Sequence, residues 1–255
     1  MIKFYVGIII LGFTVLVSCQ NSRKLIFVED FDGNQLNTSV WNYELGDGCP
    51  KKCGWGNNEI QFYTKENITV NNGNLVITAT KDSSKYKSGR ITTANKFEFQ
   101  YGTIEVRAKL PLGKGVWPAI WLLGHDIASV GWPACGEIDF MEYAGKNTHE
   151  IHTTLHTPDS HGKSKNTKVT RINNIENGFH VYKCHWTKKS IEFFVDDQLV
   201  YTFNPEVKNE RTWPFNKPFY VILNLAIGGN FGGPDVDDSI FPQEFLIDFV
   251  KVYKN

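Results

Sequence analysis

Apolar and polar residues alternate throughout the stretch Gly102-Thr-Ile-Glu-Val-Arg-Ala-Lys-Leu110. Ile104, Val106 and Ala108 fall on one side of an extended chain, and the polar residues between them fall on the other side. A period of two residues is that of a β-strand, whose successive side chains point to opposite faces. The stretch therefore predicts a half-buried strand with one face in a core and one in solvent.

The same period recurs along most of the chain, and no window of comparable length has a helical period. Asp196-Asp197 joins two such runs and predicts the turn of a β-hairpin. The fold class we expect is all-β, a sandwich of two antiparallel sheets, with long loops at 44–58 and 157–178 bordering the binding face. Further strands are expected at Asn74–Thr80, Tyr182–Trp186, Ile191–Val195, Gln198–Phe203, Phe219–Ala226 and Phe245–Tyr253.

The N-terminus has the pattern of an export signal. Lys3 precedes the apolar run Phe4–Val17, which is short for a membrane span but suits a signal peptide. The run ends in Leu16-Val-Ser-Cys19, which resembles a bacterial lipobox. We therefore expect a signal peptide at 1–18, a lipidated Cys19 opening a tether at 19–26, and one folded domain at 27–255.

The expected location is the outer membrane or cell surface. The alternative is a cleaved secretory signal, with Cys19 incidental and the protein periplasmic or secreted.

Composition narrows the range of partners. The chain has 27 basic and 27 acidic residues, so its formal net charge is zero. This balance predicts no nucleic-acid partner and no attraction to an anionic membrane surface, leaving the lipid anchor as the expected membrane contact. A neutral ligand fits better, and a monomer is the default expectation.

Four cysteines follow Cys19. Cys49 and Cys53 lie in a Gly-rich loop, where a short disulfide could stiffen the segment, and export permits disulfides. Cys135 and Cys184 lie in apolar strand-like runs and are expected to be buried thiols. The pairing does not follow from sequence, and a zinc site would need more ligands than the first pair supplies.

Three carboxylates interrupt an apolar strand-like run, Gly136-Glu-Ile-Asp-Phe-Met-Glu-Tyr143. Charges beside apolar residues cost stability unless they are paired, bound to metal or used in catalysis. In a regular strand Glu137 and Asp139 share a face, whereas Glu142 points the other way. One extra residue, a β-bulge at Phe140-Met141, would turn Glu142 back and line one cleft with all three acids.

Two facing carboxyl groups are the catalytic equipment of a glycosidase. The alternatives are a calcium site, which usually draws on flexible loops, and a solvated strand face. Nearby tryptophans favour a carbohydrate ligand, because aromatic faces stack on sugar rings. Trp117 is the expected ligand contact, Trp121 is expected to support the acids from below, and Trp132 is a further candidate contact.

The segments Glu137-Ile-Asp-Phe-Met-Glu142, Trp117-Pro-Ala-Ile-Trp121 and Gly54-Trp-Gly-Asn-Asn-Glu59 resemble glycoside hydrolase family 16, specifically its laminarinase branch. The family's bulged motif is Glu-x-Asp-x-x-Glu, whereas its lichenase branch lacks the extra residue. The resemblance implies a concanavalin A-like jelly roll with a concave cleft and retaining hydrolysis. It implies Glu137 as nucleophile, Asp139 as its partner and Glu142 as acid and base.

The resemblance also implies supporting residues. No cofactor is expected for catalysis, although a structural calcium ion at Glu29, Gly73 and Asp248 is implied. A zinc site built from His149, His152 and His156 is not expected, because only the last two share a strand face. Implied substrate-contacting or site-supporting residues are Asn57, Arg90, Trp117, Trp121 and His156.

The expected function is endo-β-1,3-glucan hydrolysis, with a laminarin-like polysaccharide as substrate. Three alternatives stay open at this point. The substrate could be mixed-linkage glucan, agarose or carrageenan; the enzyme could be a transglycosylase; or the protein could bind glycans without turnover.

Overall fold

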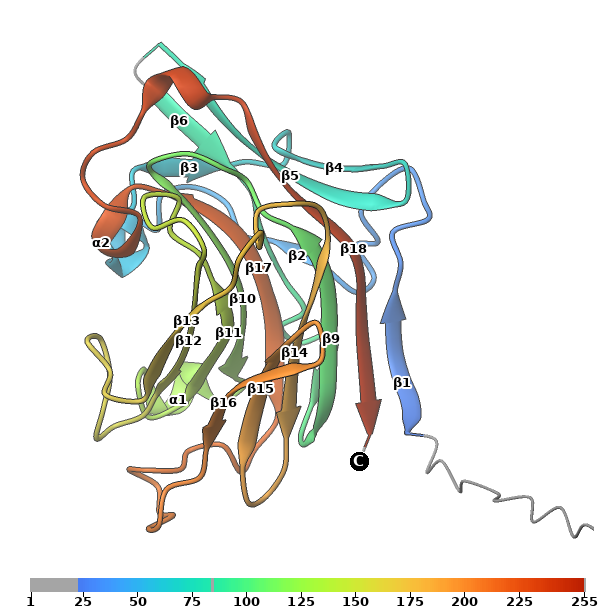
Figure 1. Cartoon of the computed structure of the whole chain (residues 1–255), viewed down its shortest axis with the longest axis vertical. Coiled ribbons are helices and arrows are strands. Elements are labelled where there is room, and N and C mark those ends of the chain that lie inside the picture. Colours follow the sequence, from blue (N-terminus) through green and yellow to red (C-terminus); the bar gives the residue numbers. More distant parts are fainter. Residues whose placement is uncertain (1–22, 84, 255) are drawn as a thin grey trace, which may run out of the picture.

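Two packed β-sheets make up the body of the molecule (Figure 1). The computed structural model describes residues 23–83 and 85–254, so the expected signal peptide and Cys19 lie outside the described residues. In the part of the chain described, no helix has the length and apolar character needed to cross a membrane. The all-β jelly-roll prediction is confirmed.

The larger sheet has ten strands, in the order β16-β15-β14-β9-β18-β5-β6-β3, with β1 beside β18 and β4 beside β5. Its strands are β1 (Lys24–Glu29), β3 (Gln61–Tyr63), β4 (Ile68–Asn71), β5 (Asn74–Asp82), β6 (Lys85–Ser88), β9 (Gly102–Lys109), β14 (His180–Trp186), β15 (Ile191–Val195), β16 (Gln198–Phe203) and β18 (Gln243–Lys254).

The second sheet has eight strands, in the order β13-β12-β11-β10-β17-β7-β2, with β8 beside β17. Its strands are β2 (Asn42–Tyr43), β7 (Arg90–Thr92), β8 (Glu98–Phe99), β10 (Val116–Gly124), β11 (Glu137–Glu142), β12 (Glu150–His156), β13 (Thr167–Arg171) and β17 (Phe219–Ile227). The described helices are short: η1 (Cys53–Gly56), α1 (Ile127–Val130), α2 (Gly229–Gly232) and η2 (Asp238–Ile240).

The expected strands are present with small shifts at their ends. The predicted hairpin is β15–β16, and Asp196 and Asp197 occupy its turn with positive φ values of 48° and 65°. Two expectations were incomplete. The loop expected at 157–178 contains the edge strand β13, whose polar and mostly exposed side chains give no buried face to detect. The sheets are antiparallel except for the parallel pair β3 and β6.

The core fills the space between the two sheets. Every residue of β17 is buried, which fits its place in the middle of the eight-stranded sheet. Ile104, Val106 and Ala108 of β9 are fully buried and contribute to the same core from the ten-stranded sheet. The alternation that predicted a half-buried strand is therefore confirmed.

The N-terminal boundary of the fold differs from the expected one. β1 begins at Lys24 and pairs with the end of β18, so three residues assigned to the tether belong to a strand. These residues pair with a strand at the other end of the chain, and such a distant pairing cannot be read from the local sequence. Figure 1 shows β1 beside the C-terminal end, on the side of the molecule opposite α1 and α2.

Candidate active site

A β-bulge in β11 decides where the three acids point. On β10, Ile120 pairs with Met141 but Trp121 pairs with Asp139, so Phe140 is the extra residue. The pairing with β12 shifts between Asp139 and Glu142 in the same way. The bulge expected from the spacing is confirmed.

The bulge also sorts the side chains of β11 between the two faces of the sheet. Phe140 and Met141 are both fully buried in the core between the sheets, although they are neighbours in a strand. Because two consecutive residues point inward, Glu142 points outward with Glu137 and Asp139. All three acids line one cleft.

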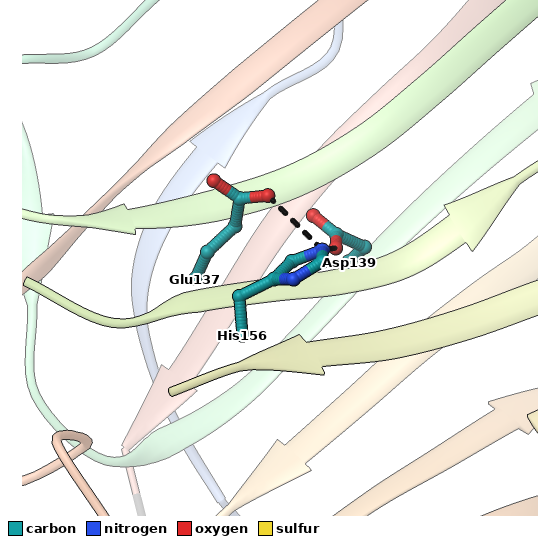
Figure 2. Close-up of side chains that lie close together, drawn as sticks. All are labelled: Glu137, Asp139 and His156. Carbon is teal, nitrogen blue, oxygen red and sulfur yellow. Dashed lines mark ion pairs between the residues drawn. The ribbon is translucent and has the colours of Figure 1, made fainter. Parts of the chain in front are cut away.

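His156 joins two of the acids from the neighbouring strand β12. Its Nε2 lies 3.2 Å from Asp139 Oδ2 and 3.5 Å from Glu137 Oε1. Figure 2 shows the imidazole directed between the two carboxylates. Trp132 Nε1 donates to the other oxygen of Glu137 at 3.0 Å. Glu137 therefore has nitrogen groups on both carboxylate oxygens, which favours its ionised form.

The two tryptophans of β10 differ in burial and in hydrogen-bond partner. Trp117, expected to be the ligand contact, is buried and donates from Nε1 to Glu142 Oε1 at 3.1 Å. Trp121, expected to support the acids, is half-buried and donates to Asn224 Oδ1 at 2.8 Å. Both line the cleft, but Trp117 contacts the acid and Trp121 presents more of its ring.

Arg90 organises the other end of the cleft. Its Nε donates to Glu44, which pairs the two charges. Its guanidinium lies 4.4 Å from the ring centre of Trp55 and 4.9 Å from that of Trp121, close enough for cation–π attraction to both. Arg90 therefore fixes two aromatic surfaces on which sugar rings can stack.

A buried carboxylate supports this end from beneath. Glu59 accepts hydrogen bonds from Asn57 Nδ2, Gln61 Nε2 and Tyr63 Oη at 3.2, 2.8 and 3.1 Å. Asn224 Nδ2 in turn donates to Tyr63 Oη at 3.2 Å, which continues the network to the partner of Trp121. Asn57 is thus oriented by Glu59 as it lines the cleft.

The electrostatics of the acids follow from their burial. Burial raises the pKa of Glu137 to about 8, and the charge of Asp139 adds to the shift. Burial with the same neighbour raises the pKa of Glu142 to about 8. Burial also holds the pKa of Asp139 well above its ordinary value. Because the three carboxyls interact, the cluster keeps protons near neutral pH, and one acid can donate while another is ionised.

The cleft has a volume of about 710 Å³, within the usual range for ligand sites. Six residues were predicted to contact the substrate or support the site. His156 contacts two of the acids from β12, and the other five line the cleft: Asn57, Arg90, Trp117, Trp121 and Trp132. The expected border loop 44–58 is confirmed, because several of its residues line the cleft. Lining residues that sequence reasoning missed include Glu44, Lys51, Lys52, Trp55 and Tyr220.

Three of these missed residues lie in sequence motifs that could have pointed to the cleft. Trp55 stands inside the Gly54–Glu59 segment, and the two lysines lie between Cys49 and Cys53, which form the disulfide. Cys135 and Cys184 are buried free thiols, as expected.

The histidines do not form the zinc site considered from sequence. His149 pairs with Glu176, and Nδ1 lies 2.9 Å from Oε2. His152 is half-buried and packs edge-on against Phe231 with ring centres 4.8 Å apart. Among the described residues, the one group with metal-ligand spacing is Glu137, Asp139 and His156, within 4.8 Å of one another. The contacts of His156 with the carboxylates give the same spacing without a metal.

The residues expected to hold calcium lie on or beside neighbouring strands of the ten-stranded sheet, whereas the acids lie on the other sheet. β1 and β5 both pair with β18, which brings Glu29 and Gly73 to the strand that carries Asp248. Arg107 Nη1 donates to Asp248 Oδ2 at 2.6 Å, and Phe31 N donates to Glu29 Oε1 at 3.2 Å. The donor set is all oxygen and fits calcium, although Arg107 already occupies one oxygen of Asp248.

The sequence model of glycosyl hydrolases family 16 matches residues 56–239. A crystal structure of laminarinase from Flavobacterium sp. UMI-01 is 61% identical, with a TM-score of 0.89, covering 91% of this chain and 100% of that one. The laminarinase catalytic domain of Thermotoga maritima is 40% identical, with a TM-score of 0.85, covering 91% and 98%. A beta-glucanase of Rhodothermus marinus is 37% identical over 96% of this chain and 92% of its own length.

Proposed function

Because the chain belongs to glycosyl hydrolases family 16, we propose that it is an endo-β-1,3-glucanase that cleaves laminarin-like polysaccharides by retention. The observation that carries the proposal is the bulge in β11, which brings Glu137, Asp139 and Glu142 to one cleft lined by tryptophans. Relatives named laminarinase and beta-glucanase support the β-1,3-glucan substrate.

The hydrogen bonds divide the roles between the two glutamates. Glu137 accepts a hydrogen bond from Trp132 Nε1 and is the glutamate that His156 contacts directly, so we assign it the attack on the anomeric carbon. Glu142 has a raised pKa and, among the described residues, one side-chain donor, Trp117. Glu142 therefore protonates the glycosidic oxygen as it leaves.

The second half of the reaction reverses the role of Glu142. Loss of its proton leaves a carboxylate that can take a proton from water, and that water then cleaves the bond between the sugar and Glu137. Asp139 lies between them in sequence and shares His156 with Glu137. It holds the imidazole in place and couples electrostatically to both glutamates.

Reducing-end release from four polysaccharides tests the substrate assignment. We expect laminarin to be cleaved fastest, mixed-linkage glucan more slowly, and agarose and carrageenan not at all. Cleavage of agarose or carrageenan in preference to laminarin would contradict the assigned substrate but would not contradict the retaining mechanism. Binding of laminarin without any product between pH 4 and pH 9 would contradict the enzyme assignment and favour a glycan-binding protein. Transfer of glycosyl groups to added oligosaccharide in place of hydrolysis would indicate a transglycosylase.

We also propose that the mature protein is a bacterial lipoprotein attached through Cys19 to the outer membrane or cell surface. The support is the apolar run Phe4–Val17 followed by Leu16-Val-Ser-Cys19. Mass spectrometry of the membrane-extracted protein tests this directly. We expect a diacylglyceryl-modified Cys19 as the first residue, whereas an unmodified N-terminus elsewhere would contradict it.

A structural calcium ion at Asp248, with oxygens from Glu29 and Gly73, remains part of the proposal, as does a monomeric state. Calcium should raise the melting temperature and leave the rate of hydrolysis unchanged well below that temperature. Asp248→Asn should abolish the calcium-dependent rise. Loss of activity on chelation without loss of stability would instead locate a metal ion at the acids.

A further inference from the structure

An exposed apolar strip lies on β1, on the side of the molecule away from β11 and α2 (Figure 1). Leu25, Ile26 and Val28 are 46%, 39% and 47% exposed, although they are nearly consecutive. Among the described strands, β1 pairs with β18 alone, so its other edge has no strand beside it. Neighbouring apolar side chains on an open edge usually have a partner.

Basic residues lie where the chain enters the strip, and one further lysine lies near its other end. Lys24 lies opposite Lys254 in the register with β18, and Lys251 lies opposite Val28. Arg23 directly precedes the strand. Within residues 23–83 and 85–254, none of these four basic side chains forms a salt bridge.

The acids nearest to this end already have cations of their own. Glu105, opposite Lys251 across β9 and β18, lies 3.6 Å from Lys183. Asp248 is bonded to Arg107. Lys24 and Lys254, which lie opposite each other, are therefore in local excess at the entry end, a feature that the zero net charge of the whole chain conceals.

Acidic residues gather at the opposite end of the strand. Glu29 ends β1, and Asp30 and Asp32 follow it. Five residues of extended chain separate Lys24 from Glu29, about 16 Å at 3.3 Å per residue. That separation exceeds the Debye length of about 8 Å at physiological salt, so the end formed by Arg23, Lys24 and Lys254 presents a field of its own.

The length of the tether limits how far this end can lie from a lipid anchor. Five Cα steps connect Cys19 to Lys24 and span at most about 18 Å even when fully extended. A lipidated Cys19 would thus hold the apolar strip and its basic neighbours close to the headgroups. At such short range even weak attraction is effective, because the anchor makes the contact intramolecular.

We propose that Leu25, Ile26 and Val28, flanked by Arg23, Lys24, Lys251 and Lys254, form a face that docks on the surface of an anionic lipid bilayer. This docking face turns the catalytic cleft away from the membrane, toward polysaccharide arriving from outside. The inference rests on the lipidation proposed above. It goes beyond the anchor, because it fixes the orientation of the domain and predicts a dependence on lipid charge.

Lipid-borne quenching of a fluorophore tests the contact in the full, processed lipoprotein. Ile26→Cys carries an environment-sensitive label, and Val207→Cys, 62% exposed and remote from β1, carries the same label as a control. The thiols of Cys135 and Cys184 are buried and should not react. In vesicles of phosphatidylcholine and phosphatidylglycerol containing a doxyl-labelled lipid, we expect several-fold stronger quenching at position 26 than at 207. Pure phosphatidylcholine or high salt should reduce the difference.

A charge-reversed variant distinguishes membrane contact through the docking face from attachment through the lipid anchor. Lys24→Glu with Lys254→Glu should lower quenching at position 26 to the level at 207, while laminarin hydrolysis in detergent solution stays unchanged. Equal quenching at both positions in the unreversed protein overturns the proposal. Energy transfer between labels at position 26 of two molecules, without lipid quenching, also overturns it by showing that a second copy covers the strip. Absence of lipid on Cys19 in the mass spectrum would also overturn the proposal, whereas the glucanase assignment is tested separately by the activity assay.

Discussion

Trp117 Nε1 donates a hydrogen bond to Glu142 Oε1 across 3.1 Å, and this bond links β10 to the bulged end of β11. The indole is only 9% exposed, and its ring packs against Phe231 with ring centres 5.2 Å apart. Glu142 is therefore held by a side chain that is itself fixed. The bond lowers the pKa of Glu142, whereas burial raises it by more.

Trp117→Phe keeps an aromatic ring but removes this donor. The pKa of Glu142 should rise further, because a hydrogen bond that favours the ionised carboxylate is lost. We expect the alkaline limb of the kcat/KM profile to move to higher pH, with roughly a tenfold lower maximum if about 1.4 kcal/mol of transition-state stabilisation is lost. Trp132→Phe is the matched control, because it removes a donor from Glu137 and should move the acidic limb upward instead. An unchanged alkaline limb in Trp117→Phe would show that the bond does not tune the acid.

Glu137→Gln replaces the proposed nucleophile with an isosteric amide. The amide cannot form the glycosyl-enzyme intermediate, so kcat on laminarin should fall by on the order of 10⁴. Glu105→Gln, on the ten-stranded sheet, serves as the control and should retain near-normal activity. Circular dichroism should show that both variants are folded. Full activity in Glu137→Gln would exclude this residue as the nucleophile.

The stereochemistry of the first product tests retention independently of any mutation. Two successive displacements at the anomeric carbon, first by Glu137 and then by water, return the original configuration. Proton NMR during the first minutes of hydrolysis should therefore show the β anomer before mutarotation produces the α anomer. Initial appearance of the α anomer would mean direct attack by water and would require another role for Glu137.

The geometry of the acids could be predicted from sequence because it depends on local spacing. An offset of five residues between Glu137 and Glu142 is incompatible with one face of a regular strand, and one inserted residue restores it. Phe140 is that residue in the pairing with β10. The alternating segments predicted the sandwich for a similar reason, since a period of two residues directly reflects burial of one face.

Features that depend on distant parts of the chain could not be predicted in this way. Trp117 and Trp121 are four residues apart on one strand, and their hydrogen-bond partners come from β11 and β17. Which tryptophan supports an acid is therefore decided by strand order. The pairing of Arg90 with Glu44 likewise depends on β7 lying beside β2.

Asp139→Asn should stabilise the protein at neutral pH while reducing its activity. Burial raises the pKa of Asp139 well above its ordinary value, so the folded protein keeps a proton that the unfolded chain releases above about pH 4. Stability then falls as pH rises from about 4 toward the folded pKa, because the unfolded state binds fewer protons. Asparagine has no charge to bury and also removes repulsion from Glu137 and Glu142. We therefore expect the free energy of unfolding of Asp139→Asn to exceed that of wild type at pH 7 and to differ little from it near pH 4.

Urea unfolding of wild type and Asp139→Asn across this pH range measures the difference. Asp235→Asn is the control, because its side chain is 76% exposed and its substitution should change stability little at any pH. A gain for Asp139→Asn that is independent of pH would show that packing, and not the buried charge, accounts for it. A loss of stability at pH 7 would mean that the ionised carboxylate of Asp139 is stabilised by His156, whose Nε2 lies 3.2 Å away. In that case the active site would hold its proton on one of the two glutamates.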